Sequence, residues 1–162
     1  MNDLLQLLQD FYRDKLAMLL QHQAGARAVA QYDANNTYQY IINREDTHLS
    51  WLTAAISTLG NPPDPTAMTE PERQAEKGRD GWRNLATEDA REAAAFVERW
   101  RPRVESMTNA RHRGMLRVIL GETLEQKRFF EQAAAGNTEL LGRRPDAVGA
   151  RVGEVLPTRW VE

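Results

Sequence analysis

The sequence contains no cysteine among its 162 residues. Disulfide bridges, zinc sites built from thiolates and cysteine nucleophiles are therefore excluded. No apolar run reaches the length that is needed to cross a membrane. The N-terminus also lacks the basic region and the cleavage site of a signal peptide. These absences predict a cytoplasmic protein that does not enter a membrane.

The chain has little net charge and no long basic stripe. Its formal net charge is −2 at pH 7, so we expect no nucleic-acid partner. Hydrophobic residues make up 41% and charged residues 27% of the chain, which is ordinary for a soluble globular domain. The length corresponds to one domain with a substantial core. No long stretch alternates between polar and apolar residues as a β-strand does, so an all-α fold is predicted.

Apolar residues recur at helical spacing in four stretches. We expect helices over residues 4–25, 33–60, 87–102 and 109–135, with Asp33 and Thr87 as N-caps. Gly25, Gly60 and Gly136 mark expected helix ends, and Pro102 is expected to kink or end the third helix.

Two segments do not follow the helical pattern. Residues 61–81 are polar and rich in proline and glycine, which is typical of a connection. The connection is long enough to cross the full length of a bundle. We expect residues 1–136 to form one four-helix domain. Residues 137–162 are expected to form a mostly irregular tail that packs on the bundle, or on a partner, through Leu156 and Trp160.

The second predicted helix carries a carboxylate within its apolar stripe. Glu45 points the same way as Tyr38, Leu52 and Ile56, and His48 lies at the edge of that face. Charged side chains are almost never buried without a partner. A metal ion, an arginine or a second carboxylate that shares a proton is therefore expected to meet Glu45 inside the fold.

The fourth predicted helix repeats this arrangement. Glu122 is central on its apolar face, and Glu125 follows three residues later, as His48 follows Glu45. The two motifs are E-x-x-H and E-x-x-E. A spacing of three places both side chains on neighbouring parts of one helix surface, so that both can reach one ion.

The chain resembles the ferritin-like superfamily of four-helix bundles in the stretches "YIINREDTHLSWLTAAISTLG" (residues 40–60) and "VILGETLEQKRFFEQ" (residues 118–132). The resemblance implies a long crossover between the second and third helices. It also implies a di-metal carboxylate site with iron or manganese and oxidative or peroxide chemistry on an unidentified small-molecule substrate. Glu45 and Glu122 would then bridge the ions, and His48 and Glu125 would be terminal ligands.

This chain departs from the family pattern at three places. The family has two E-x-x-H pairs, whereas the second pair here ends in Glu125. The family also has a glutamate on each of the other two helices, and the nearest candidates here are Asp14 and Asp89. For both aspartates, a solvated helix face or a helix start is the simpler interpretation.

Two further interpretations remain open. The stretch "NARHRGMLRVIL" resembles the histidine-bearing helix of DinB-like bundles, which implies a metal held by His48 and His112. Alternatively, the chain is a metal-free structural or interaction module whose inward acids pair with arginines, which far outnumber lysines.

Self-association is a separate expectation. Trp51 lies off the core stripe, and Leu116, Leu120 and Leu124 form a second apolar ridge on the fourth helix. Such a ridge indicates a second buried face or an interface, and a homodimer is predicted.

Overall fold

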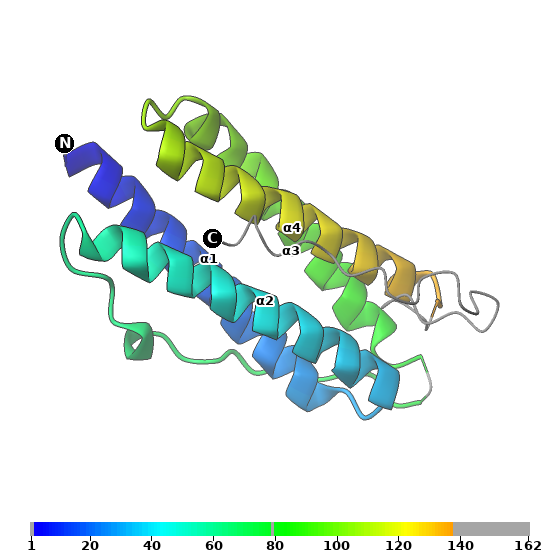
Figure 1. The fold of residues 1–162 in the computed structure, drawn as a ribbon. Coiled ribbons are helices and arrows are strands. Elements are labelled where there is room, and N and C mark those ends of the chain that lie inside the picture. The colour runs from blue at the N-terminus through cyan, green and yellow to red at the C-terminus, as the bar shows by residue number, and fades with distance from the viewer. Residues whose placement is uncertain (1, 79, 138–162) are drawn as a thin grey trace, which may run out of the picture.

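The computed structural model describes residues 2–78 and 80–137, which form a bundle of four α-helices. The helices are α1 (Asn2–Ala28), α2 (Tyr32–Ser57), α3 (Arg83–Glu105) and α4 (Ala110–Ala134), with a short 3-10 helix at Pro65–Ala67 (Figure 1). The described part of the chain contains no strand, so the all-α prediction is confirmed. No described helix has the length and apolar character to cross a membrane. The expected docking of Leu156 and Trp160 lies outside the described residues.

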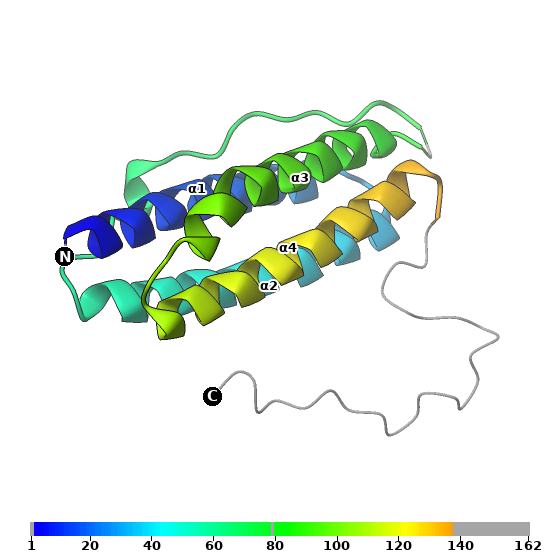
Figure 2. The same ribbon diagram turned by 90° about the horizontal axis from the view of Figure 1, so that it is seen from above.

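The helices form two hairpins that are joined by a long crossover. α1 pairs with α2, and α3 pairs with α4, while the segment from α2 to α3 runs along the length of the bundle (Figures 1 and 2). Near its start the Gln9 side chain donates to the Asn61 carbonyl at 2.9 Å, and near its end the Gln31 side chain donates to the Gly78 carbonyl at 2.8 Å. α2 and α3 consequently run in the same direction, as the crossover prediction requires.

Gly25 does not end α1, which continues to Ala28. A Cβ atom at Gly25 would lie 2.6 Å from the Tyr38 ring, a distance too short for any side chain. The missing side chain therefore admits the Tyr38 ring from α2. The glycine is needed for packing between helices rather than for a turn.

Other helix boundaries also differ from the predicted ones. α2 begins at Tyr32 after Gln31, and α3 begins at Arg83 because the buried Leu85 and Ala86 extend its apolar face. α3 also passes through Pro102 to its end at Glu105. Proline removes a single hydrogen bond there, close to the end of the helix, and the buried Val104 holds the last turn on the core. At α4 the Asn109 side chain caps the backbone N–H of His112, at 3.0 Å.

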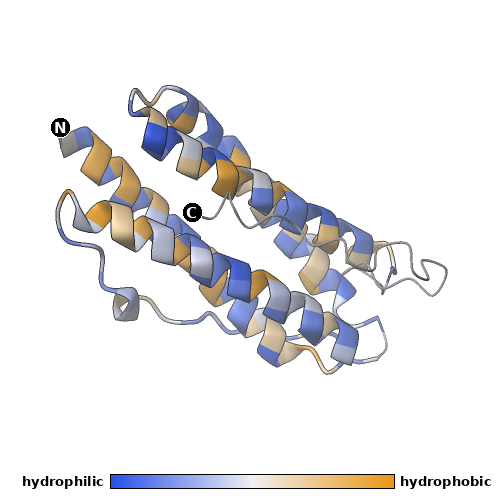
Figure 3. Cartoon of the chain, viewed as in Figure 1, coloured by the Kyte–Doolittle hydropathy of each residue, from blue (hydrophilic) through white to orange (hydrophobic). Residues whose placement is uncertain are grey.

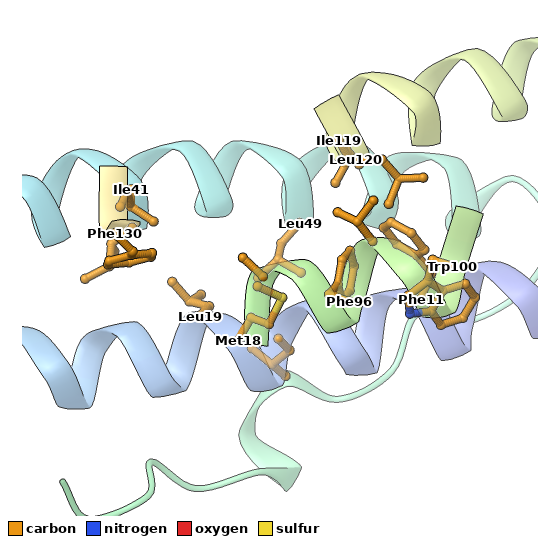
Figure 4. Packing of buried hydrophobic residues seen from close by; sticks show 14 of the residues in the cluster. Phe11, Met18, Leu19, Ile41, Leu49, Phe96, Trp100, Ile119, Leu120 and Phe130 are labelled. Atoms are coloured by element: carbon orange, nitrogen blue, oxygen red, sulfur yellow. The ribbon is translucent and has the colours of Figure 1, made fainter. Parts of the chain in front are cut away.

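The core lies between the two hairpins. Phe11 packs edge to face against both Phe96 and Trp100 at one end, with ring centroids of Phe11 and Trp100 4.9 Å apart. Phe130 lies at the other end (Figure 4), where its ring packs with the Tyr38 ring. Hydrophobic and hydrophilic residues interleave along every helix (Figure 3), as amphipathic helices require.

The apolar ridge on α4 belongs largely to this core. Leu116 and Leu120 are buried, and Leu124 is exposed. Trp51 is half-buried, with its ring 5.6 Å from the His48 ring. Packing within the bundle thus accounts for two of the three ridge leucines.

A buried ionic network as the candidate functional site

Glu45 is fully buried and contacts two basic side chains of α1, Lys15 and His22. Its Oε2 atom lies 3.2 Å from the Lys15 ammonium, and its Oε1 atom contacts Nδ1 of His22. Lys15 and His22 are seven residues apart, so they share one face of α1 two turns apart. Both are as buried as Glu45 itself. Glu45 therefore has buried partners, as its burial requires, but they are a lysine and a histidine of the first helix rather than the metal ion, arginine or second carboxylate that we expected.

Lys15 also connects this group to α4. Its ammonium donates to the Thr123 hydroxyl at 3.2 Å, and that hydroxyl donates to the Ile119 carbonyl at 2.8 Å. Lys15 is one of three lysines in the chain, yet its side chain is 0% exposed. A single ammonium group thus bridges α1, α2 and α4 in the interior.

The charges within this group stabilise one another. Burial by itself raises the pKa of Glu45, but His22 and Lys15 outweigh it and lower that pKa to about 2. Burial likewise lowers the pKa of His22, and the Glu45 carboxylate more than reverses the effect, leaving the pKa above its ordinary value. Glu45 is consequently an ionised carboxylate at neutral pH, and it favours the protonated form of the His22 imidazole beside it.

Glu122 forms a second group with Arg44 and His48 from α2. Its Oε1 atom accepts hydrogen bonds from Arg44 Nε at 2.9 Å, from Arg44 Nη2 at 2.5 Å and from His48 Nε2 at 3.0 Å. Burial lowers the pKa of His48, which Glu122 only partly opposes, so the imidazole is neutral at pH 7. Nε2 then carries the proton, and Nδ1 is a bare acceptor.

Several polar atoms near this second group have no hydrogen-bond partner among the residues that the structure describes. They are His48 Nδ1, Glu122 Oε2 and both amide atoms of Gln126, which is 2% exposed. Gln126 lies one turn beyond Glu122 on α4. Orphaned buried polar atoms are rare in folded proteins and often mark a bound water or ion.

Asp89 is the centre of a third group, in which the crossover takes part. The Tyr38 hydroxyl donates to it at 2.5 Å, the Gln21 amide at 2.9 Å and the Arg73 guanidinium at 3.1 Å. Burial, followed by the charge of Asp89, raises the pKa of Tyr38, so the phenol remains a donor. Asp89 is fully buried, in contrast to the solvated position that its place near the helix start indicates.

The six predicted metal-site residues therefore divide among separate groups. Glu122 meets His48, while Glu45 belongs to the Lys15 group. Asp14 accepts from Arg99 and Trp100 close to the surface, and Glu125 is exposed on α4. Among residues 2–78 and 80–137, no three His, Cys, Asp or Glu side chains are placed to hold a metal ion.

The pairing of His48 with His112 is not seen either. His48 contacts Glu122, which follows His112 by ten residues, and that separation is about 15 Å along a helix. His112 lies in the first turn of α4, where its backbone N–H takes the Asn109 cap. The two histidines therefore lie at different depths of the bundle.

Sequence reasoning missed Lys15, His22, Gln126 and Arg73. The first two carried a readable signal, because Leu8, Phe11, Lys15 and His22 follow the helical period of one face. Gln126 points inward on α4, as Glu122 and Phe130 do. Glu125 is the preceding residue, so its side chain points about 100° away from that of Gln126. Arg73 had no such signal, because it belongs to the irregular crossover.

We predict that the three histidines titrate separately. The imidazole of His22 should titrate above its ordinary pKa of 6.5, because Glu45 holds its proton. His48 and His112 should titrate below 6.5, since burial disfavours their charged forms. An NMR titration of the full chain resolves all three, and His22 and His48 titrating together at the ordinary value would contradict the network.

The same shifts set the sign of the pH dependence of stability. The contribution of Glu45 is complete above its ordinary pKa of 4.5 and is lost as pH falls toward 2. The contribution of His22 is complete below 6.5 and is lost as pH rises through its raised pKa. His48 acts in the opposite direction to His22, because its lowered pKa favours the folded state at higher pH.

No known protein family, curated protein or solved structure matches this chain.

Proposed function

We propose that this chain is a metal-independent helical module, in which the interior charges specify the packing of two hairpins and the outer surface makes the functional contacts. The observation that carries this proposal is the position of Lys15. Its fully buried ammonium lies 3.2 Å from Glu45 and 3.2 Å from Thr123. A divalent cation at Glu45 would be repelled by this ammonium at close range.

The arrangement of the bundle supports a relation to ferritin-like proteins as part of the same proposal. Two helical hairpins joined by a crossover along the bundle are typical of that group. In this proposal the ammonium of Lys15 supplies the positive charge that metal ions supply in a di-metal bundle. A cytoplasmic location and a homodimer remain predictions beside it.

The di-metal function is the second candidate. Glu122 Oε2 and the Gln126 amide oxygen are buried without hydrogen-bond partners in the described part of the chain, and oxygen donors beside a histidine suit iron or manganese. Two features of the residues oppose it. Arg44 already binds Glu122 through two nitrogen atoms, and Lys15 already forms a salt bridge with Glu45.

Elemental analysis separates these two functions. The full chain, expressed in medium supplemented with iron, manganese and zinc and purified without chelator, should contain background metal only. Glu45→Gln and Glu122→Gln should leave that background unchanged, as should the surface control Glu98→Gln. Stoichiometric metal in the natural chain that is lost in Glu122→Gln or Glu45→Gln, but retained in Glu98→Gln, would establish the second function instead.

A further inference from the structure

The crossover covers one side of the bundle and leaves the opposite side to α2 and α4. Gln9 of α1 binds the start of the crossover, and Arg73 of the crossover binds the Gln21 carbonyl of α1 and Asp89 of α3. Figure 2 shows the crossover beside α1 and α3, with α2 and α4 on the other side of the bundle. The outer surface of these two helices is therefore not covered by the crossover.

Two contacts place α2 and α4 side by side along this surface. The Tyr40 ring of α2 lies 5.8 Å from the Phe129 ring of α4, and Arg44 of α2 binds Glu122 of α4 at 2.5 Å. Residue numbers rise along α2 as they fall along α4, so the two helices run antiparallel. Their outer sides consequently form one continuous surface.

The outer side of α4 carries a second regular line of residues, separate from its core face. Positions that are spaced alternately by four and three residues share one side of a helix. In α4 such a line, called the α4 seam below, consists of Arg111, Met115, Val118, Glu122, Glu125 and Phe129. Val118 is 38% exposed, and Met115 and Phe129 are half-buried. On α2 the seam is flanked by Tyr40, which is 39% exposed, and by the half-buried Trp51. Apolar side chains on a regular outer line indicate a partner helix.

The α4 seam carries opposite charges at equal distances from its centre. Arg111 precedes Val118 by seven residues, and Glu125 follows it by seven, so each lies about 10 Å from Val118 along the helix. Both charged side chains are exposed, and neither forms an ion pair with a residue in the described part of the chain. Two such seams that run antiparallel, with their Val118 residues opposite each other, bring unlike charges together at both ends. A parallel arrangement would bring like charges together.

Two glycines beside Val118 are not required by the packing of the bundle itself. No atom of the described chain lies within 4 Å of a Cβ atom added at Gly114 or Gly121, in contrast to Gly25. Glycine inside a helix destabilises that helix. Both glycines lie within about 60° of Val118 around the helix. Their missing side chains allow the backbone of another helix to approach α4 closely on the side of the seam.

We propose that this surface is the interface of a homodimer, in which α4 packs antiparallel against α4 of a second copy with Val118 at the two-fold axis. A two-fold interface needs a surface that is complementary to itself. The seam meets this condition, because Arg111 of one protomer lies beside Glu125 of the partner subunit, and the reverse. The inference goes beyond the proposed function, since it concerns the outer surface and holds whether or not the interior binds a metal ion.

Analytical ultracentrifugation of the full chain tests this interface. We expect a dimer at micromolar concentration. Arg111→Glu and Glu125→Arg each place like charges together at both ends of the interface, and each should weaken dimerisation at least about tenfold. The double variant Arg111→Glu/Glu125→Arg restores unlike pairs in reversed order and should dimerise as the natural chain does. Arg128→Glu is the matched control, because it makes the same change of charge at an exposed position outside the seam. It should leave dimerisation unchanged.

A single cysteine locates the two-fold axis. The chain contains no cysteine, so Val118→Cys introduces the only thiol of each protomer. Two thiols at the axis lie close enough to form a disulfide, and mild oxidation should convert this variant to a covalent dimer. Arg128→Cys, which lies outside the seam, should remain unlinked under the same conditions.

Four results would overturn the proposal. The first is a monomer at micromolar concentration. The second is equal weakening in Arg111→Glu and Arg128→Glu, because net charge then explains the effect. The third is a double variant as weak as the single variants, because the antiparallel register is then wrong. The fourth is a photoreactive label on the Val118→Cys variant that attaches to residues 138–162 of its own chain, because the C-terminal segment then covers the surface in place of a second copy.

Discussion

Replacing Lys15 by Met should destabilise the fold by about 3–5 kcal/mol, the usual cost of removing one partner from a buried ion pair. The change leaves the Glu45 carboxylate buried with the His22 imidazole beside it, and it removes the Lys15 donor from the Thr123 hydroxyl. Urea denaturation of the natural and variant chains measures the difference. Lys127→Met is the matched control, because Lys127 forms a surface pair with Glu131 at 3.1 Å. Its loss should cost less than about 1 kcal/mol.

A double variant shows whether the loss arises from the isolated carboxylate. Lys15→Met combined with Glu45→Gln removes both charges, and it should recover a large part of the stability lost in Lys15→Met alone. A stability of Lys15→Met within about 0.5 kcal/mol of the natural chain would contradict the structural role of the network, since changes of that size are typical of the surface.

Replacing Arg73 by Ala should have a comparable effect, about 3 kcal/mol or more. The Arg73 side chain is 7% exposed and binds the fully buried Asp89, the Gln21 carbonyl and the Leu85 carbonyl. Its loss leaves Asp89 with only the neutral donors Tyr38 and Gln21, and it releases the crossover from the hairpins. Thermal denaturation measures the first consequence, and limited proteolysis within residues 61–81 measures the second.

Arg27→Ala is the control for the crossover. Arg27 also binds the crossover, through Glu70 at 2.9 Å, but its side chain is 75% exposed. Exposed pairs contribute less than about 1 kcal/mol, so this variant should melt close to the natural chain. If both arginine variants melted alike, burial would not be the reason for the contribution of Arg73.

The helices and the crossover were predictable because their signals are local. Apolar periodicity shows which segments are helical, and it shows that Glu45 points inward. The partners of Glu45 were not predictable in the same way. Lys15 and His22 share the inward face of α1, but the level at which α1 meets α2 is set by packing, which includes the fit of Tyr38 against Gly25.

The choice between Glu125 and Gln126 illustrates a finer limit. Neighbouring positions on a helix differ by about 100° in direction, so a modest rotation of α4 about its axis determines which of the two is buried. That rotation depends on the three other helices. Asp89 was misjudged for a related reason, because its burial requires Arg73, which arrives from a segment without periodicity.

The contact between Gly25 and Tyr38 has an evolutionary consequence. A Cβ atom at position 25 would overlap the ring that donates to Asp89. The two positions are therefore coupled, and drift at one constrains drift at the other. In a set of related sequences, larger residues at position 25 should accompany smaller ones at position 38. Such covariation would identify distant relatives of this chain even where the charged residues have changed.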